Sequence, residues 1–157
     1  MTELTAQGIF DDSVRRLAGM KCMAAKWLSP NSSPRCMYRS PTGPCLVGVY
    51  LSDEEVAPDG GVTYLECNTE VQVPTLDDIP NSGILHLMDY YLVPDRLCQH
   101  VKLLSALQDT HDNMQLWADA GHGPPIPDEM GSELEAVATE FSVSNGVIRE
   151  VWPHLYP

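Results

Sequence analysis

Apolar residues recur at helical spacing in several stretches, and this pattern predicts most of the helices. The first stretch spans residues 8–28, and the second begins at Pro94 and ends within 110–113. A third helix is expected to start at a capping box formed by Ser132 and Glu135, whose side chains would satisfy free backbone donors. The compact apolar block 84–93 favours a short helix over a buried strand.

Strand-like patterns lie between the first two helices. Residues 35–39 and 45–51 predict the two strands of a β-hairpin joined by a Ser-Pro-Thr-Gly-Pro connection. Short strands are also predicted at 62–66 and 70–73. Together with the helices, these patterns predict an α+β fold, in which an antiparallel β-hairpin or small sheet packs against three or four helices.

The length of 157 residues fits a single domain, 1–157. Within it, the Gly- and Pro-rich segment 121–131 is expected to be a surface loop, and 144–157 a C-terminal extension. The N-terminal segment lacks a basic and an apolar signal region, and no apolar run approaches the ~20 residues of a membrane span. We therefore expect a cytoplasmic protein with no membrane partner.

Charge is strongly uneven along the chain. There are 22 acidic and 9 basic residues, which give a net charge of −13. The first 52 residues hold six of the bases and three acids, so the remainder has 19 acids and three bases. Between Ser40 and Asp95 there is no Lys or Arg. Such a field repels nucleic acid and attracts basic protein surfaces, although acidity of this kind also serves solubility alone.

Candidate chemistry is sparse. Cys36 and Cys45 would be neighbours across the predicted hairpin, but zinc sites usually show closely spaced ligand pairs, so buried thiols are favoured over a metal site. His111-Asp112 is the dipeptide of metal phosphohydrolases, but local bonding at a helix end is favoured for this pair too. No nucleophile motif and no phosphate-binding glycine loop is present. We expect neither enzymatic activity nor a cofactor.

Residues 133–152 resemble a helix-turn-helix. Ala138 matches the small residue at which the two helices cross, and Ser144 would open the second helix. The expected buried positions around the crossing are Val137, Phe141, Val143, Ile148 and Val151. Ser142 stands where the turn usually has glycine, and the second helix offers only Arg149 against Glu150. Because a DNA-reading helix needs cations around it, a packing motif is favoured over DNA contact.

The predicted hairpin resembles a motif of small phage and prophage proteins, roughly C-x-Y-R, a turn, and G-x-C-x-V-G. The residues that carry this resemblance are Cys36, Tyr38, Arg39, Gly43, Cys45, Val47, Gly48 and Asp53. Weaker matches follow at Leu107, Gln108, His111, Asp112, Trp117, Leu134, Val137, Ala138 and Phe141. The resemblance implies a viral or prophage origin, a location in the cytoplasm of a bacterial host cell and a small α+β domain, and it carries no catalytic role with it.

These observations lead to one main functional hypothesis. The chain would be a phage-encoded interaction protein that inhibits a host defence system, of the anti-CRISPR or anti-restriction type, by binding a basic, nucleic-acid-binding surface of a host protein or complex. The candidate partner-binding residues are Asp53, Glu54, Glu55, Asp59, Glu66, Asp77 and Asp78. No direct nucleic-acid contact is expected, and a homodimer is left open. The alternatives are a helix-turn-helix DNA-binding regulator and a metal-dependent hydrolase.

Overall fold

The computed structural model shows a chain that forms two compact units. One contains the described residues up to Met23 and from Lys102 to Pro157, and the other contains those between Ala24 and Val101. The structure describes residues 4–26, 35–36, 39–40, 43–50, 62–66, 69–73 and 95–157.

Helix α1, Ala6–Gly19, opens the first unit. The Thr5 side chain accepts a hydrogen bond from the Gly8 amide at 3.0 Å, and such an N-cap stabilises a helix start by about 1 kcal/mol. The apolar residues at helical spacing are fully buried, and they are Ile9, Phe10, Val14 and Leu17. The sequence pattern therefore identified the buried face of this helix correctly.

The end of α1 differs from the prediction of a helix to residue 28. The helix stops at Gly19, and Met20 is already extended, with φ −77° and ψ 140°. Glycine is among the weakest helix formers, and no neighbour lies within 4 Å of the position its Cβ would take. Gly19 thus marks the end of the helix and not a close contact between elements.

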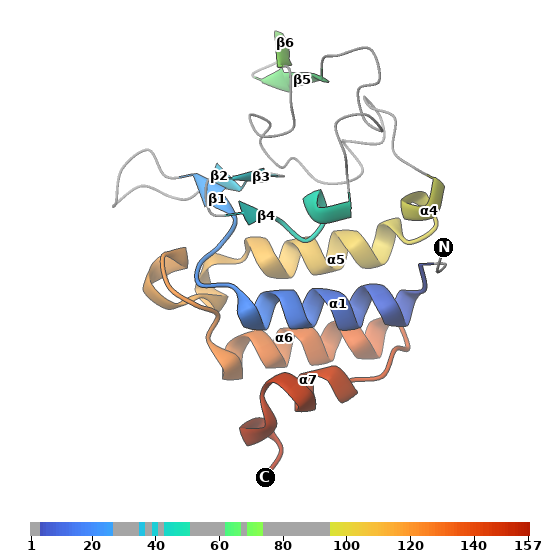
Figure 1. The fold of residues 1–157 in the computed structure, drawn as a ribbon, viewed down its shortest axis with the longest axis vertical. Coiled ribbons are helices and arrows are strands. Elements are labelled where there is room, and N and C mark those ends of the chain that lie inside the picture. Colours follow the sequence, from blue (N-terminus) through green and yellow to red (C-terminus); the bar gives the residue numbers. More distant parts are fainter. Residues whose placement is uncertain are drawn as a thin grey trace. The chain divides into compact units, whose positions relative to one another are not determined.

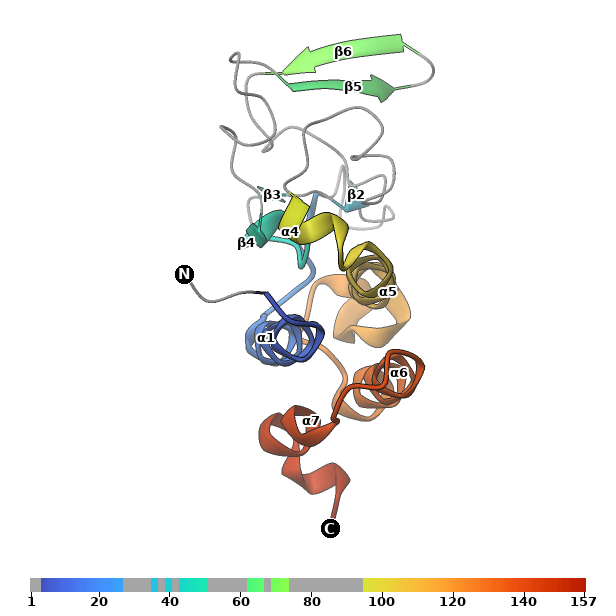
Figure 2. The same ribbon diagram turned by 90° about the vertical axis from the view of Figure 1, so that its right-hand side faces the viewer.

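Three further helices complete the first unit. They are α5 at Val101–Asp112, which begins one residue before the unit boundary, α6 at Pro127–Glu140 and α7 at Gly146–Val151. Short 3-10 helices follow α5 and α7: η3 at Met114–Leu116, η4 at Ala118–Gly121 and η5 at Pro153–Leu155. Helices α1 and α5 run in the same direction, and α6 runs in the opposite one (Figures 1 and 2). Helix α1 packs against both α6 and α7.

Each of these helices contributes apolar side chains to the core of the first unit. The buried apolar residues of this unit outside α1 include Met23, Leu103, Leu104, Leu107, Leu116, Trp117, Met130, Leu134, Val137, Ala138, Val147, Ile148 and Trp152. Gly131 of α6 lies against the C-terminal segment, because a Cβ there would lie 2.7 Å from Leu155 Cδ1 and would require that side-chain end to shift. This packing makes residues 146–157 a structural part of the unit.

The second unit contains short antiparallel strand pairs. The first two pairs have two residues per strand: β1 (Ala25–Lys26) with β2 (Arg35–Cys36), and β3 (Arg39–Ser40) with β4 (Gly43–Pro44). The third pair joins β5, Val62–Glu66, to β6, Thr69–Val73, in register from Val62 opposite Val73 to Glu66 opposite Thr69. This pair lies where two short strands were predicted.

The predicted hairpin over 35–51 is wrong. Cys36 pairs with Ala25, and no strand forms over the described residues 45–50, because residues 45–47 form a turn before the 3-10 helix η1, Gly48–Tyr50. The Val49 amide bonds the Cys45 carbonyl at 3.2 Å, so local turns satisfy backbone groups that a strand would have paired. A short run that is apolar on both faces does not distinguish a strand from a buried turn.

The predicted α+β fold is corrected by these observations. The described structure is mainly helical, and the strand pairs remain two-stranded. Within the described part of the first unit, the β-structure consists of an isolated bridge between Trp117 and Pro125. The fold is therefore a helical one with small hairpins, and not a sheet that carries helices.

Two helix boundaries are corrected as well. The single helix predicted from Pro94 is broken into α4, Asp95–Cys98, and α5, with a turn at Gln99 and His100. Helix α6 begins at Pro127, five positions before the predicted capping residue Ser132. Proline suits the first helical position because its φ is preset and its missing N–H has no partner to lose there.

Candidate functional site

Most of the predicted partner-binding acids lie outside the described residues. These are Asp53, Glu54, Glu55, Asp59, Asp77 and Asp78. The backbone of Glu66 ends β5 and pairs with Thr69. Because six of the seven residues lie outside the described structure, their role as a partner-binding set stays a prediction.

Helix α6 carries a second set of acids that sequence reasoning missed. It has five acidic residues and no Lys or Arg. Glu129, Glu133 and Glu140 are exposed and recur at intervals of four and seven positions, which places them on one stripe of the helix. Asp128 is exposed beside this stripe. The sequence signal was available, because acids at helical spacing opposite an apolar face predict an acidic helix surface.

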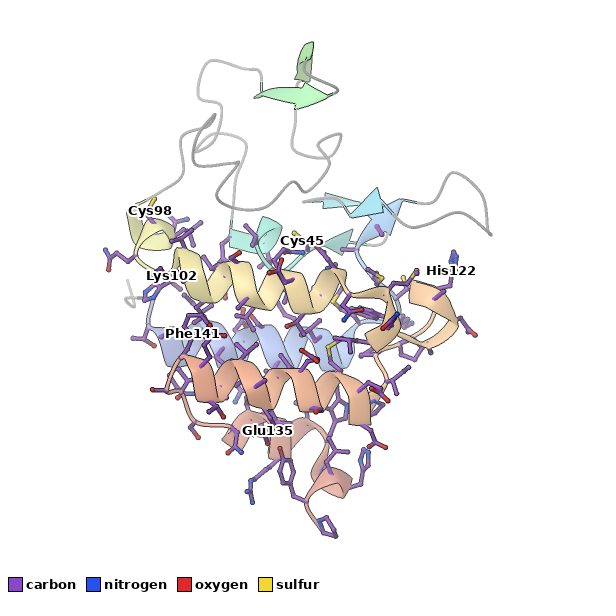
Figure 3. All side chains as sticks on the ribbon, turned by 180° about the vertical axis from the view of Figure 1, so that it is seen from behind. Cys45, Cys98, Lys102, His122, Glu135 and Phe141 are labelled. Carbon is purple, nitrogen blue, oxygen red and sulfur yellow. The ribbon has the colours of Figure 1, made fainter. Side chains whose placement is uncertain are left out.

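Two of these carboxylates lie at the start of α6, where negative charge stabilises a helix. Asp128 and Glu129 lie in the first turn, where the helix dipole favours negative charge by about 0.3–1 kcal/mol per residue. The expected capping box is not formed, since Ser132 lies inside the helix and no side chain caps its N-terminus. Glu135, which is labelled on α6 in Figure 3, instead accepts hydrogen bonds from Asn145.

The turn between α6 and α7 is held by side chains from α1, from α6 and from the turn itself. Gln7 of α1 bonds the backbone of Ser144 twice: its Oε1 accepts from the Ser144 amide at 2.7 Å, and its Nε2 donates to the Ser144 carbonyl at 3.2 Å. Asn145 Nδ2 donates to both carboxylate oxygens of Glu135, at 3.0 and 2.9 Å. These bonds fix the angle at which α7 leaves α6.

Only some of the residues that carry the helix-turn-helix resemblance are buried. Ala138, Val137 and Ile148 are buried, as the resemblance required, whereas Phe141, Val143 and Val151 are only half-buried. Ser142 has a φ of 54°, the left-handed conformation that glycine adopts most easily. Ser142 thus has the backbone conformation of the glycine that usually stands at this position of the turn.

The exposed charges of α7 are engaged within the unit. Arg15 Nε of α1 bonds Glu150 Oε2 at 2.8 Å, and this hydrogen bond and the guanidinium charge lower the pKa of the Glu150 carboxyl and raise the pKa of Arg15. Arg149 lies over the ring of Tyr156, with 4.4 Å from its guanidinium carbon to the ring centre. The single cationic side chain of α7 therefore makes a cation–π contact within the unit.

His111 and Asp112 bond locally at the end of α5, as expected. His111 Nδ1 lies 2.8 Å from Asp112 Oδ1, and Gln108 Nε2 donates to the same oxygen at 2.7 Å. The His111 side chain has no exposed surface, and Trp117 Nε1 donates to the His111 carbonyl at 2.8 Å. This cluster fastens the end of α5 to η3.

Asp109, on the exposed side of the same helix end, has a perturbed carboxyl group. Its pKa is raised above the ordinary value, first by partial burial and second by the negative charge of Asp112. Both causes disfavour the ionised carboxylate in the folded protein. Asp109 is thus a small source of electrostatic strain at neutral pH.

The segment predicted as a surface loop, 121–131, is partly helical. It follows a turn in which Asp119, Ala120 and Gly121 have positive φ angles, and α6 begins at Pro127. The stem is closed by the Ala118 amide on the Pro124 carbonyl at 2.8 Å. The side chain of His122 projects from the tip (Figure 3).

The expected thiols and membrane behaviour can be compared with the described residues only. Cys22, Cys45 and Cys98 form no disulfide among the described residues, and Cys36 pairs through its backbone with Ala25. In the same part of the chain, no three His, Cys, Asp or Glu residues are grouped in a way that would hold a metal ion. No described helix has the length and apolar character needed to cross a membrane.

Comparison with known proteins gives no further guide to the family. No match to this chain was found among protein-family models, curated proteins or solved structures.

Proposed function

We propose that this chain is a non-enzymatic interaction protein that presents carboxylates to a basic, nucleic-acid-binding surface of a host protein. The resemblance of residues 36–53 to a phage and prophage motif suggests that it is phage-encoded and acts against a host defence system. The observation that carries the proposal is the exposed stripe of Glu129, Glu133 and Glu140 on a helix without any Lys or Arg.

The spacing of the stripe shows how much of the binding surface α6 can supply. At a rise of ~1.5 Å per residue, the stripe spans roughly 16 Å. One DNA strand places a phosphate about every 3.4 Å along the axis, so it has about five charges over that length against three on the stripe. The proposal therefore needs a second acidic segment, and residues 53–78 hold the seven acids proposed from the sequence.

Charge reversal of each acidic set tests the proposal. The tagged protein is used to capture partners from a bacterial host lysate, and the captured protein is released with duplex DNA and identified by mass spectrometry. We expect a nucleic-acid-binding protein, and we expect loss of capture with the triple variant Glu129→Lys, Glu133→Lys, Glu140→Lys. The variant Asp53→Lys, Glu54→Lys, Glu55→Lys tests the other segment in the same way.

A graded control separates charge from shape. The Gln variants at positions 129, 133 and 140 keep the size of each side chain, so capture should weaken less than with Lys. Far-ultraviolet circular dichroism checks that α6 is intact in both. Unchanged capture with both Lys triples, or release that is insensitive to DNA, would exclude the proposed surface.

A helix-turn-helix regulator is the second candidate, and the packing of α6, α7 and α1 against one another favours it. Against it stand the acidic surface of α6 and the Arg15–Glu150 pair on α7. A gel shift at moderate salt with bacterial promoter DNA decides between the two. A shift that Arg149→Ala abolishes supports the regulator, and no shift supports the interaction protein.

A further inference from the structure

We propose that Asn145 is a protected deamidation site whose conversion releases α7 from α6. The inference is independent of the proposed function. It rests on the Asn145-Gly146 dipeptide and on the hydrogen bonds that surround it at the start of α7. Asparagine is a thermolabile residue, and a following glycine leaves its side-chain carbon open to attack because glycine has no Cβ.

The chemical step is an intramolecular substitution followed by hydrolysis. The Gly146 amide nitrogen loses its proton and attacks Asn145 Cγ, so that an N–Cγ bond forms and the Cγ–Nδ2 bond breaks. The proton leaves with Nδ2 as ammonia, and a cyclic imide remains. A water molecule then opens either carbonyl of the imide, which gives aspartate or isoaspartate at position 145.

Three features of the folded geometry oppose attack of the Gly146 nitrogen on Asn145 Cγ. The ψ of Asn145 is 8°, which places the backbone nitrogen of Gly146 near the backbone nitrogen of Asn145 and away from the Asn145 Cγ that it would attack. The Gly146 amide donates to Ser144 Oγ at 3.1 Å. Asn145 Nδ2, the leaving group, donates to both Glu135 oxygens. Ring closure therefore requires rotation about ψ, which unwinds the first turn of α7.

The product does not fit the site that Asn145 leaves. An aspartate would place a carboxylate where Glu135 now accepts hydrogen bonds from an amide, so two like charges would meet in a half-buried position. Isoaspartate would also lengthen the backbone directly before α7. Because α7 and the residue after it bury Val147, Ile148 and Trp152, its release would expose apolar surface.

The rate of deamidation tests the protection. The full-length protein is incubated folded and in denaturant at neutral pH, and peptides that contain position 145 are followed by mass spectrometry. We expect the folded protein to react more slowly than the unfolded one. We expect Glu135→Ala to speed the folded reaction by roughly 5- to 30-fold, the factor that one or two lost kcal/mol of local stability gives, without changing the unfolded rate.

Two further variants serve as a control and as a second test of the protection. Gly146→Ala is the matched control, since an added Cβ there meets only Ser144 Oγ at an ordinary 3.4 Å and the new methyl group obstructs attack. It should fold normally and react slowly in both states. Ser144→Ala frees the Gly146 amide and should speed the folded reaction, which keeps the inference testable if Glu135→Ala does not fold.

The consequence is read from the product mimic Asn145→Asp. It should melt at a lower temperature than the wild type and bind an apolar dye more strongly. Equal rates in the folded and unfolded protein, or a wild-type melting temperature for Asn145→Asp, would overturn the inference.

Discussion

Ser142 is held in a backbone conformation that its own side chain disfavours. Its φ of 54° lies in the left-handed region, where a residue with a Cβ costs roughly 1–2 kcal/mol more than in the right-handed one. The bonds from Gln7 to Ser144 and from Asn145 to Glu135 hold the surrounding turn, and α7 adds its buried side chains. The cost is offset by the packing of the two helices.

Ser142→Gly is therefore expected to stabilise the protein by about 1 kcal/mol, because glycine takes this conformation without steric cost. Thermal or chemical unfolding measures the change. The matched control is Ser132→Gly in the exposed interior of α6, which should destabilise by about 0.5 kcal/mol because glycine is the weaker helix former. The same sign at both positions would contradict the assigned turn.

Asp109 gives a pH-dependent prediction at the residue scale. The pKa of its carboxyl group is raised in the folded protein, so the folded state is favoured while this group is protonated. This advantage is present at low pH and is lost as pH rises through the ordinary and then the raised pKa. Asp109→Asn should thus melt slightly higher than the wild type at neutral pH, and the difference should disappear in acid, where both side chains are neutral. A difference that is largest in acid would show that the sign is wrong.

At the scale of elements, periodicity located the buried faces better than the ends of helices. Val14, Leu17, Leu104 and Leu107 recur at helical spacing within two of the predicted helices, and all four are buried. The end of α1 at Gly19 and the start of α6 at Pro127 were missed, because local glycine and proline chemistry decided them against longer apolar patterns. The hairpin failed because local turn bonds at residues 45–50 replaced strand pairing.

The contact between α1 and α7 provides a test at this scale. Arg15 lowers the pKa of Glu150, so the pair stabilises the fold above the ordinary glutamate pKa, and this contribution is lost as pH falls through the lowered value. Glu150→Gln should therefore reduce the melting temperature slightly at neutral pH and low salt, and not in acid.

Added salt should also remove the difference, since both side chains are exposed and screened by ions. Glu140→Gln on α6 removes the same charge away from Arg15 and is the control. If the two variants lose equal stability at every pH, the Arg15–Glu150 pair does not link α1 to α7.

For the whole molecule, the sequence predicted the excess of acidic residues but not the acidic stripe that the structure shows on α6. The net charge of −13 follows from composition, and the seven acids proposed for the partner surface came from the segment without Lys or Arg. The stripe on α6 became visible only once Pro127 was known to begin the helix, because Asp128 and Glu129 had been assigned to a loop. A misplaced helix start thus hid part of the candidate surface.

The central claim is that carboxylates on this surface compete with nucleic acid for a basic partner. Its most direct test is the affinity for the purified partner as salt is raised, measured for the wild type and for the Lys triple at Glu129, Glu133 and Glu140. Exposed charge pairs are screened over about 10 Å at 0.1 M salt, so wild-type affinity should fall steadily with salt, and the variant should bind weakly throughout. Affinity that is independent of salt and equal for the two proteins would contradict the account.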